Sequence, residues 1–516
     1  MKTEQIIGLA VVWGGVLLAA PPEGGVVPGW TPPVRTAAAR APAGYRLKET
    51  RLGPMDTQIL FPTFSADGRH FAYVIPRGPK FSVVVDGKTD TDVDPDTDTE
   101  TLYKRVAALV FSPDGKRLAH WAQRGERQFM VVDGAAQKVY AGFGLPIFSA
   151  DSARVVYNVQ TGSQECVVVD GREGPGFDAV GNPVLSPDSR RLMYAVRQGA
   201  KWAVWVDGKV GAAYDTLLGE PIFSADSQHV AYGAKLGNRW RVVHDEQAGV
   251  EYDAVGTPVF SPDGRRLAYR ARQGAKWLVV MDGQAGSAHD GVADGELVFS
   301  PDSKRVAYVA LDGEQQRVVV DGQAGTAFDG IAAKTLRFSP DSQRVLYGAR
   351  QGVKACAVVA GKAEGEYAGI NTTMFSADSK RTAYVALRGG KALVVVDGQA
   401  GAEYDAITSL SFSPDSSHVA YSAARGAQRF VVVDGQSSVA YDEAAGLVFS
   451  PDGKHTAYRA VQGNKWLVVL DGQAGAGFDG VLAGSPRFTA EGGVEFLAIK
   501  GTMLYRVEYV PVARNE

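Results

Sequence analysis

The 516-residue sequence contains only two cysteines, Cys166 and Cys356, and seven histidines. Two cysteines in a chain of this length exclude a disulfide-stapled scaffold and a multi-cysteine zinc fold. A basic excess is also lacking, because 54 basic residues stand against 57 acidic ones and the net charge is −3. Proteins that bind nucleic acid by neutralising phosphates carry a basic patch or stripe, so no nucleic-acid partner is expected. A sustained apolar period of 3.6 residues is missing as well, which argues against helical repeats.

Long uncharged apolar runs are scarce, and the one at Ile6–Ala20 has 15 residues. A membrane-spanning helix needs roughly 20 apolar residues, so this length is more typical of the apolar region of a secretory signal. We predict that residues 1–20 are a signal peptide or, if uncleaved, an N-terminal membrane anchor through residues 6–20. Residues 21–44 are rich in Pro, Ala and Gly and are predicted to form a flexible linker. The protein is therefore expected to be exported and to be periplasmic, cell-surface or secreted.

Glycine, in contrast, is abundant, with 61 residues, and an internal repeat begins near residue 45. The string F-S-[PA]-D-[GS] occurs ten times, and the degenerate copies Leu185–Ser189 and Phe488–Gly492 bring the number to twelve. Their fourth residues are spaced by 37–39 residues, apart from a first interval of 47. These residues are Asp67, Asp114, Asp151, Asp188, Asp226, Asp263, Asp302, Asp341, Asp378, Asp415, Asp452 and Glu491. Such a period predicts similar units that pack on their neighbours.

The unit Pro258–Val292 shows what each repeat contains: four short apolar segments separated by Pro-Asp-Gly, Gln-Gly and Asp-Gly turns. Four antiparallel strands in about 40 residues are typical of one blade of a β-propeller. We predict an all-β fold, a β-propeller built from twelve four-stranded repeats over residues 45–516. Single propellers usually have about four to eight blades, so two six-bladed rings are favoured over one twelve-bladed ring. Residues Tyr45–Leu52 are expected to supply the missing fourth strand of the last blade.

Segments such as SPDGRRLAY and SPDSKRVAY resemble the WD40-like (PD40) repeat of TolB-type propellers and of the propeller domains of some serine peptidases. The resemblance covers roughly residues 45–516 and implies an extracytoplasmic interaction scaffold. The Gly-His and Trp-Asp dipeptides of true WD40 blades are missing here. TolB-like proteins usually carry a separate N-terminal domain and half as many blades. The sequence has no G-x-S-x-G elbow, so the chemistry of the peptidase relatives is not carried over.

Residues that recur in every unit are poor candidates for catalysis, because catalysis needs a few groups in one place. The repeated aspartate of S-P-D is expected to cap its own turn, and the Asp-Gly pair after the third strand is expected to form a hairpin. Trp202, Trp240, Trp277 and Trp466 recur at one position and are expected to pack between blades. Cys166 and Cys356 are expected to be unpaired apolar residues of third strands.

The histidines follow the same logic. His70, His229, His418 and His455 occupy the position where other units have arginine, and His120 replaces the usual tyrosine. The cluster His244-Asp245-Glu246 occurs once and is a weak metal candidate, since the sequence shows no partner for it. We predict no catalytic residues and no bound organic cofactor.

The first interval is longer because of an acidic insertion between Thr89 and Glu100. Its alternating acids are Asp90, Asp92, Asp94, Asp96, Asp98 and Glu100. Carboxylates without a basic neighbour could bind Ca²⁺, a hard ion that takes six to eight oxygen ligands. Pro95 stands where an EF-hand loop needs glycine, so this is not an EF-hand. Calcium at these residues is the metal prediction, and a solvated acidic loop is its alternative.

These patterns favour a non-catalytic extracytoplasmic propeller that binds a protein, peptide or glycan of the cell envelope. The alternative is a propeller-type glycan lyase or hydrolase with a site at the channel mouth. That enzyme would need pattern-breaking polar residues on neighbouring blades, whereas the deviations at Arg337, Thr372 and Arg487 are scattered. A third hypothesis, a structural surface array tethered by residues 6–20, shares the fold and differs in its partner.

Overall fold

The computed structural model describes residues 41–54, 59–66, 68–89, 102–482 and 484–512. All the elements of secondary structure within these ranges are β-strands. None of the described residues forms a helix that could cross a membrane. The predicted signal peptide or anchor, residues 21–40 of the predicted linker, and the acidic insertion Asp90–Glu100 lie outside them.

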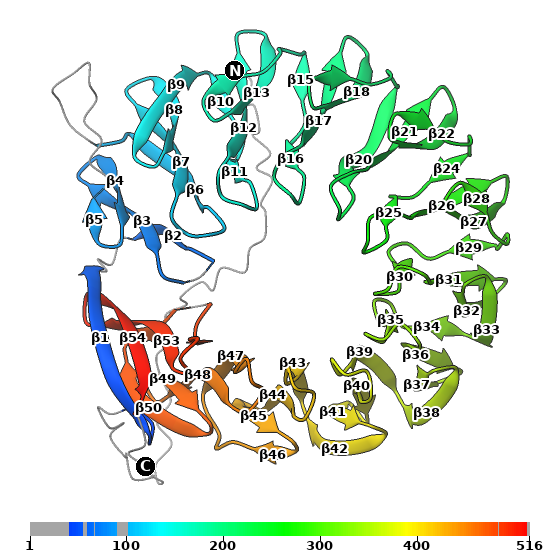
Figure 1. The fold of residues 1–516 in the computed structure, drawn as a ribbon. Helices are drawn as coiled ribbons and strands as arrows, with labels where there is room; N and C mark the ends of the chain where they lie inside the picture. Colours follow the sequence, from blue (N-terminus) through cyan, green and yellow to red (C-terminus); the bar gives the residue numbers. More distant parts are fainter. Residues whose placement is uncertain (1–40, 55–58, 67, 90–101, 483, 513–516) are drawn as a thin grey trace, which may run out of the picture. The chain divides into compact units, whose positions relative to one another are not determined.

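The strands form twelve antiparallel sheets that follow one another around a single ring (Figure 1). The chain is therefore an all-β propeller with twelve blades, which we number I to XII from the sheet of β2 to the sheet of β54. Each blade has an inner, a second, a third and an outer strand, and the inner strands face the centre of the ring (Figure 1). In six blades the inner strand is split into two short pieces that pair with the same second strand.

The strand bounds repeat from blade to blade. The inner strands are β2 (Leu60–Phe64), β6 (Arg105–Phe111), β10 (Gly142–Phe143) with β11 (Ile147–Phe148), β15 (Ala179–Val180) with β16 (Val184–Leu185), β20 (Thr216–Phe223), β24 (Ala254–Val255) with β25 (Val259–Phe260), β29 (Gly291–Val292) with β30 (Val298–Phe299), β34 (Gly330–Ile331) with β35 (Arg337–Phe338), β39 (Gly369–Phe375), β43 (Ala406–Phe412), β47 (Glu443–Phe449), and β51 (Gly480–Val481) with β52 (Arg487–Phe488). The second strands are β3 (Phe71–Arg77), β7 (Leu118–Arg124), β12 (Val155–Thr161), β17 (Leu192–Gln198), β21 (Val230–Leu236), β26 (Leu267–Gln273), β31 (Val306–Asp312), β36 (Val345–Gln351), β40 (Thr382–Arg388), β44 (Val419–Arg425), β48 (Thr456–Gln462) and β53 (Val494–Lys500).

The other two strands lie toward the outside. The third strands are β4 (Lys80–Val85), β8 (Arg127–Val132), β13 (Gln164–Val169), β18 (Lys201–Val206), β22 (Arg239–His244), β27 (Lys276–Met281), β32 (Gln315–Val320), β37 (Lys354–Val359), β41 (Lys391–Val396), β45 (Gln428–Val433), β49 (Lys465–Leu470) and β54 (Met503–Pro511). The outer strands are β5 (Lys88–Thr89), β9 (Ala135–Tyr140), β14 (Arg172–Glu173), β19 (Lys209–Val210), β23 (Gln247–Ala248), β28 (Gln284–Ala285), β33 (Gln323–Phe328), β38 (Lys362–Tyr367), β42 (Gln399–Tyr404), β46 (Gln436–Ser437), β50 (Gln473–Phe478) and β1 (Tyr45–Pro54).

Turn chemistry explains why each third strand reverses where it does. In blade VI, Asp282 and Gly283 both have positive φ angles, 50° and 79°, and Met281 pairs with Gln284 across the turn. Two consecutive residues with positive φ define the type I′ hairpin, which matches the twist of the flanking strands and favours Asp-Gly. The same geometry recurs in the other blades except XII, whose outer strand is β1, and it fixes the register of the outer strand.

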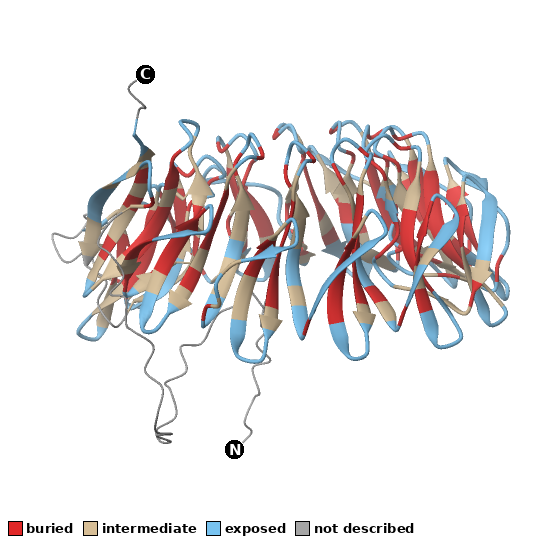
Figure 2. Ribbon diagram, turned by 90° about the horizontal axis from the view of Figure 1, so that it is seen from below, coloured by how far each residue is buried: buried red, intermediate tan, exposed pale blue. Residues whose placement is uncertain are grey.

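Burial is concentrated in the second and third strands, while the loops at both ends of the blades are exposed (Figure 2). The buried residues form twelve hydrophobic clusters, and each one is shared by two neighbouring blades. One cluster joins blades VI and VII through Val279 and Tyr308, and another joins blades XII and I through Leu504 and Tyr73. The packing therefore continues across the midpoint of the array, between blades VI and VII. The ring closes where blade XII meets blade I. Two six-bladed rings, which the sequence analysis favoured, are not what the structure shows.

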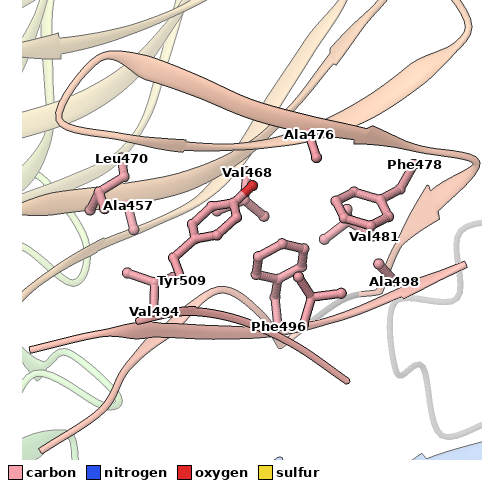
Figure 3. Close-up of a cluster of buried hydrophobic side chains, with 11 residues drawn as sticks. Ala457, Val468, Leu470, Ala476, Phe478, Val481, Val494, Phe496, Ala498 and Tyr509 are labelled. Atoms are coloured by element: carbon pink, nitrogen blue, oxygen red, sulfur yellow. The ribbon is translucent and has the colours of Figure 1, made fainter. Parts of the chain in front are cut away.

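Strand β1 is the outer strand of blade XII, because Tyr45 pairs with Pro511 and Glu49 with Val507. The first strand of the array thus lies in the same sheet as the last one. Between blades XI and XII, Phe496 packs edge-on against both Phe478 and Tyr509, with ring centroids 5.5 and 5.1 Å apart (Figure 3). The closing blade is joined to its neighbour by the same kind of apolar contact as the others.

Candidate functional site

The S-P-D turns form a belt of hydrogen bonds around one end of the blades. In blade VI the Ser261 hydroxyl donates to Asp263 Oδ1 over 2.6 Å, and the same oxygen accepts the Arg265 N–H. The Asp263 N–H in turn donates to the Ser303 hydroxyl of blade VII. The serine hydroxyl first, and the backbone N–H second, lower the pKa of Asp263, and the same causes act on Asp188 and Asp302 in their turns. The repeated aspartate therefore caps its own turn and ties it to the next blade.

A second belt lies at the Asp-Gly hairpins. Asp282 Oδ1 accepts the backbone N–H of Leu267, and its Oδ2 accepts Arg266 Nε at 2.9 Å. In four blades a histidine replaces this arginine and places its Nδ1 2.5–2.7 Å from the aspartate. The pairs are His70–Asp86, His229–Asp245, His418–Asp434 and His455–Asp471. Each of these histidines is thus paired within its own blade, and the four lie in different blades.

A third belt lies at the opposite ends of the second strands, at a tail position near the end of each repeat where most units have an aromatic residue followed by aspartate, as in Tyr404-Asp405. Asp290 accepts Lys276 Nζ of blade VI at 2.6 Å and the Gly313 N–H of blade VII at 2.7 Å. The ring at this tail position packs edge-on against the second-strand ring of the next blade in nine places, and in seven of them an aspartate follows it. Their ring centroids are 5.5–6.4 Å apart, in pairs such as Tyr252–Tyr269. All three repeated polar motifs thus hold the strands and the neighbouring blades in place.

Among the described residues, open hollows lie at three interfaces between neighbouring blades. Each hollow is situated between the aromatic residues of the third belt and the Asp-Gly hairpins. The hollow between blades IV and V has a volume of about 270 Å³, that between IX and X about 390 Å³, and that between X and XI about 400 Å³. Each has an apolar floor and a charged rim. In the hollow between IX and X, Val394 and Tyr421 form part of the floor and Asp397 and Arg381 part of the rim. The same repeat positions therefore build the same kind of depression in different blades.

The tryptophans and cysteines lie mostly where the sequence placed them. Trp240, Trp277 and Trp466 pack against the clusters between blades V and VI, VI and VII, and XI and XII. Trp202 is not among the residues of the clusters between blades, although a cation of its own blade, Arg197, lies over its ring at 5.9 Å from the centroid, as cations do over the other three. Both cysteines are free thiols, in the clusters between blades II and III and between VII and VIII.

The deviations in the inner strands are engaged locally. Arg337 donates to the Leu336 carbonyl, and Arg487 bonds the carbonyls of Gly484 and of Ala66 in blade I. Thr372 is exposed on β39. These contacts do not assemble the cluster that a channel-mouth enzyme would need.

Two groupings were missed by sequence reasoning. His289, at a tail position that is aromatic elsewhere, is buried, with Nδ1 3.0 Å from Asp312 Oδ1 and Nε2 3.5 Å from the Tyr308 hydroxyl. The second grouping brings His229 to the single cluster His244-Asp245, which the sequence left without a partner. The constant hairpin register, which pairs Ala231 with His244, was the signal that could have revealed it.

No model of a known protein family matches the chain, and no curated protein matches it. Among solved structures, TolB from Acinetobacter baumannii is 17% identical, with a TM-score of 0.23, over 39% of this chain and 56% of TolB. The chain thus spans little more than half of that protein. The β-propeller domain of the Trilobed protease from Pyrococcus furiosus is 10% identical, with a TM-score of 0.24, over 51% of this chain and 94% of the domain.

A crystal structure of a eukaryotic initiation factor is 13% identical, with a TM-score of 0.34, over 77% of this chain and 99% of its own. Similarities this low establish no family for the chain. The propeller assignment rests on the twelve sheets themselves.

Proposed function

We propose that the chain is a non-catalytic, exported interaction scaffold that binds an extended protein, peptide or glycan of the cell envelope. The observation that carries the proposal is the recurrence of similar hollows between blades IV and V, IX and X, and X and XI. A ligand that repeats along its length can occupy several equivalent hollows at once. Linked contacts of this kind raise the overall affinity far above that of one site.

The chemistry of the hollows favours binding over catalysis. Their rims carry aspartates that are already paired with arginine or histidine, as Asp434 is with His418. A general acid or base has to exchange a proton with a substrate, whereas these carboxylates also hold a backbone N–H of the second strand of their own blade, as Asp434 holds that of Val419. The export prediction for residues 1–20 supports a partner in the envelope.

The test is a pulldown of envelope extract with the full-length protein, with a glycan array beside it. Ala400 is exposed and lines the hollow between IX and X, and Gln436 lines that between X and XI. We expect Ala400→Trp to weaken binding and the double variant with Gln436→Trp to weaken it at least tenfold more. Val353→Trp, at a turn residue that is 90% exposed and outside the hollows, is the matched control.

Equal binding by all variants would contradict the role of the hollows. Release of new reducing ends from envelope polysaccharide by the same preparation would contradict the non-catalytic proposal and favour the glycan lyase or hydrolase. Fractionation of the producing cells tests export independently, since an entirely cytoplasmic protein would refute it.

A further inference from the structure

Blade V departs from the repeat at two positions that flank one hairpin aspartate. The residue before the aspartate is His244, whereas ten other blades have an apolar residue there. These residues are Val85, Val132, Val169, Val206, Met281, Val320, Val359, Val396, Val433 and Leu470. The residue after it is Glu246, where those ten blades have glycine. Glu246 keeps the backbone conformation of the glycine it replaces, with φ = 67°, which is strained for a residue with a side chain.

These departures bring three ligand atoms together. His229, His244 and Asp245 each offer one ligand atom, and the three atoms lie within 4.8 Å of one another. Asp245 Oδ2 is 2.6 Å from His229 Nδ1 and 3.6 Å from His244 Nε2. Two ligands of a tetrahedral ion with bonds of about 2.0–2.1 Å are separated by about 3.4 Å. The His244 spacing already fits, and the His229 contact has to lengthen by less than about 1 Å when a metal replaces the shared proton.

One of these atoms has no other function. His244 Nε2 is shielded from solvent, with less than 1 Å² exposed, and has no hydrogen-bond partner among the described residues. A polar atom in such a place costs free energy unless something binds it. The other His–Asp pairs do not create this situation, because Val85, Val433 and Leu470 stand at the corresponding position in their blades. Blade V is therefore the place in the described chain where two imidazoles and a carboxylate converge.

The surroundings hold the ligands in position. The Val230 N–H donates to Asp245 Oδ1 over 2.9 Å, which leaves Oδ2 directed at the two histidines. The Phe260 ring of blade VI lies 5.8 Å from the His244 ring and 6.5 Å from the His229 ring. Hydrogen bonds to a ligating carboxylate and an apolar wall are the outer features that orient metal ligands. Asp245 and Glu246 also line the hollow between blades IV and V, whereas the two imidazoles face blade VI.

We propose that His229, His244 and Asp245 bind a divalent transition-metal ion of the Zn²⁺ class. Imidazole nitrogen suits Zn²⁺, Cu²⁺ and Ni²⁺, whereas Ca²⁺ takes six to eight oxygen ligands, so calcium is a poor fit here. The site is distinct from the acidic insertion predicted to bind calcium. It does not depend on the proposed scaffold function.

The experiment is calorimetry of the full-length protein with Zn²⁺ and with Ca²⁺, supported by Co²⁺ absorption spectra. The wild type is expected to bind one Zn²⁺ at this site and to show the visible bands of low-symmetry Co²⁺. His244→Val restores the residue of the other blades and should reduce Zn²⁺ affinity at least 100-fold. His418→Arg, which alters a His–Asp pair without a third ligand, should leave it unchanged.

A gain of function tests the same geometry without removing a ligand. Val433→His places a second imidazole beside the His418–Asp434 pair of blade X, as His244 stands beside His229–Asp245. This variant should bind a second Zn²⁺. Equal Zn²⁺ binding by wild type and His244→Val, or no Zn²⁺ binding by wild type, would overturn the proposal. If His244→Val failed to fold, a stoichiometry of one for Val433→His would count against the site and a stoichiometry of two would support it.

Discussion

His120 illustrates how one residue can weaken an otherwise regular interface. It occupies the second-strand position that is tyrosine in ten other blades, and its ring packs edge-on against Tyr103 at 5.8 Å. It is 1% exposed, and neither ring nitrogen has a hydrogen-bond partner among the described residues. Burial lowers the pKa of His120 to about 3, so the folded protein keeps it neutral. The unfolded chain binds a proton there below about pH 6.5, and the fold does not.

This gives a pH-dependent prediction. As the pH falls from 6.5 toward 3, protonation of His120 in the unfolded state lowers the free energy of unfolding, because the native state binds no proton there. At pH 5 the penalty is about 2 kcal/mol, from about 1.4 kcal/mol per pH unit. His120→Tyr should therefore raise the thermal midpoint more at pH 5 than at pH 8, as measured by calorimetry at both pH values. An equal gain at both would show that His120 is not buried neutral.

At the scale of the blade, paired turns determine where strands end and how neighbours are joined. The Asp-Gly hairpin sets the register of the outer strand, and its aspartate also holds the second strand and the arginine or histidine before it. Blade VIII lacks this aspartate: Ala360 takes its place with φ = 49°. Arg344 of that blade keeps the bond to the Ser379 carbonyl of blade IX, which the equivalent arginines of blades II, IV and VII also make to their next blade.

Ala360→Asp should therefore stabilise the protein. Aspartate tolerates this left-handed conformation better than alanine does. Its carboxylate can also accept hydrogen bonds from the Val345 N–H and the Arg344 guanidinium. One such net hydrogen-bonded contact contributes about 1 kcal/mol. The denaturant midpoint measures the gain.

Asp397→Ala in blade IX is the matched reverse change. It removes the contacts to Thr382 N–H and Arg381 Nε, at 2.8 and 2.9 Å, and should lower the midpoint by a similar or larger amount. A lower midpoint for Ala360→Asp would contradict the assigned role of the hairpin aspartate.

Much of the blade could be predicted from sequence because its signals are local. The Pro-Asp-Gly and Asp-Gly turns and the apolar third strand each fall within a few residues, so four strands per unit followed directly. The meeting of His229 with His244 depends on strand register, which the turn geometry fixes and composition does not reveal. The long-range role of the tail aspartates, such as Asp290 between Lys276 and Gly313, likewise becomes visible only when two blades are in contact.

At the scale of the whole array, the number of blades in a ring depends on small angles that add up over many interfaces. Nine interfaces use the same aromatic pair, and the belts of hydrogen bonds recur from blade to blade, whichever ring size results. The sequence therefore predicted twelve blades but favoured two six-bladed rings over the single ring of the structure, since nothing local distinguishes one ring from two. The structure resolves this through the clusters between blades VI and VII and between XII and I.

A ring of this size depends on how its two ends meet. Strand β1 pairs with β54 from Tyr45 to Pro54, and Leu47 packs against the cluster between blades XI and XII. Leu52 packs against the cluster between XII and I, so one strand contributes to the interfaces on both sides of blade XII. Without β1, the edge of β54 would present unpaired N–H and C=O groups, a template for pairing with another chain.

We therefore expect residues 55–516 to be less stable than residues 41–516, with a lower thermal midpoint and association through the open edge. Light scattering and sedimentation measure the association, and calorimetry measures the midpoint. Residues 41–516 retain every β1 contact and serve as the matched control. Adding a synthetic peptide of residues 41–54 should reverse the association, because it can pair with β54 in the native register. Identical midpoints and sizes for the two proteins would mean that blade XII holds the ring closed with three strands.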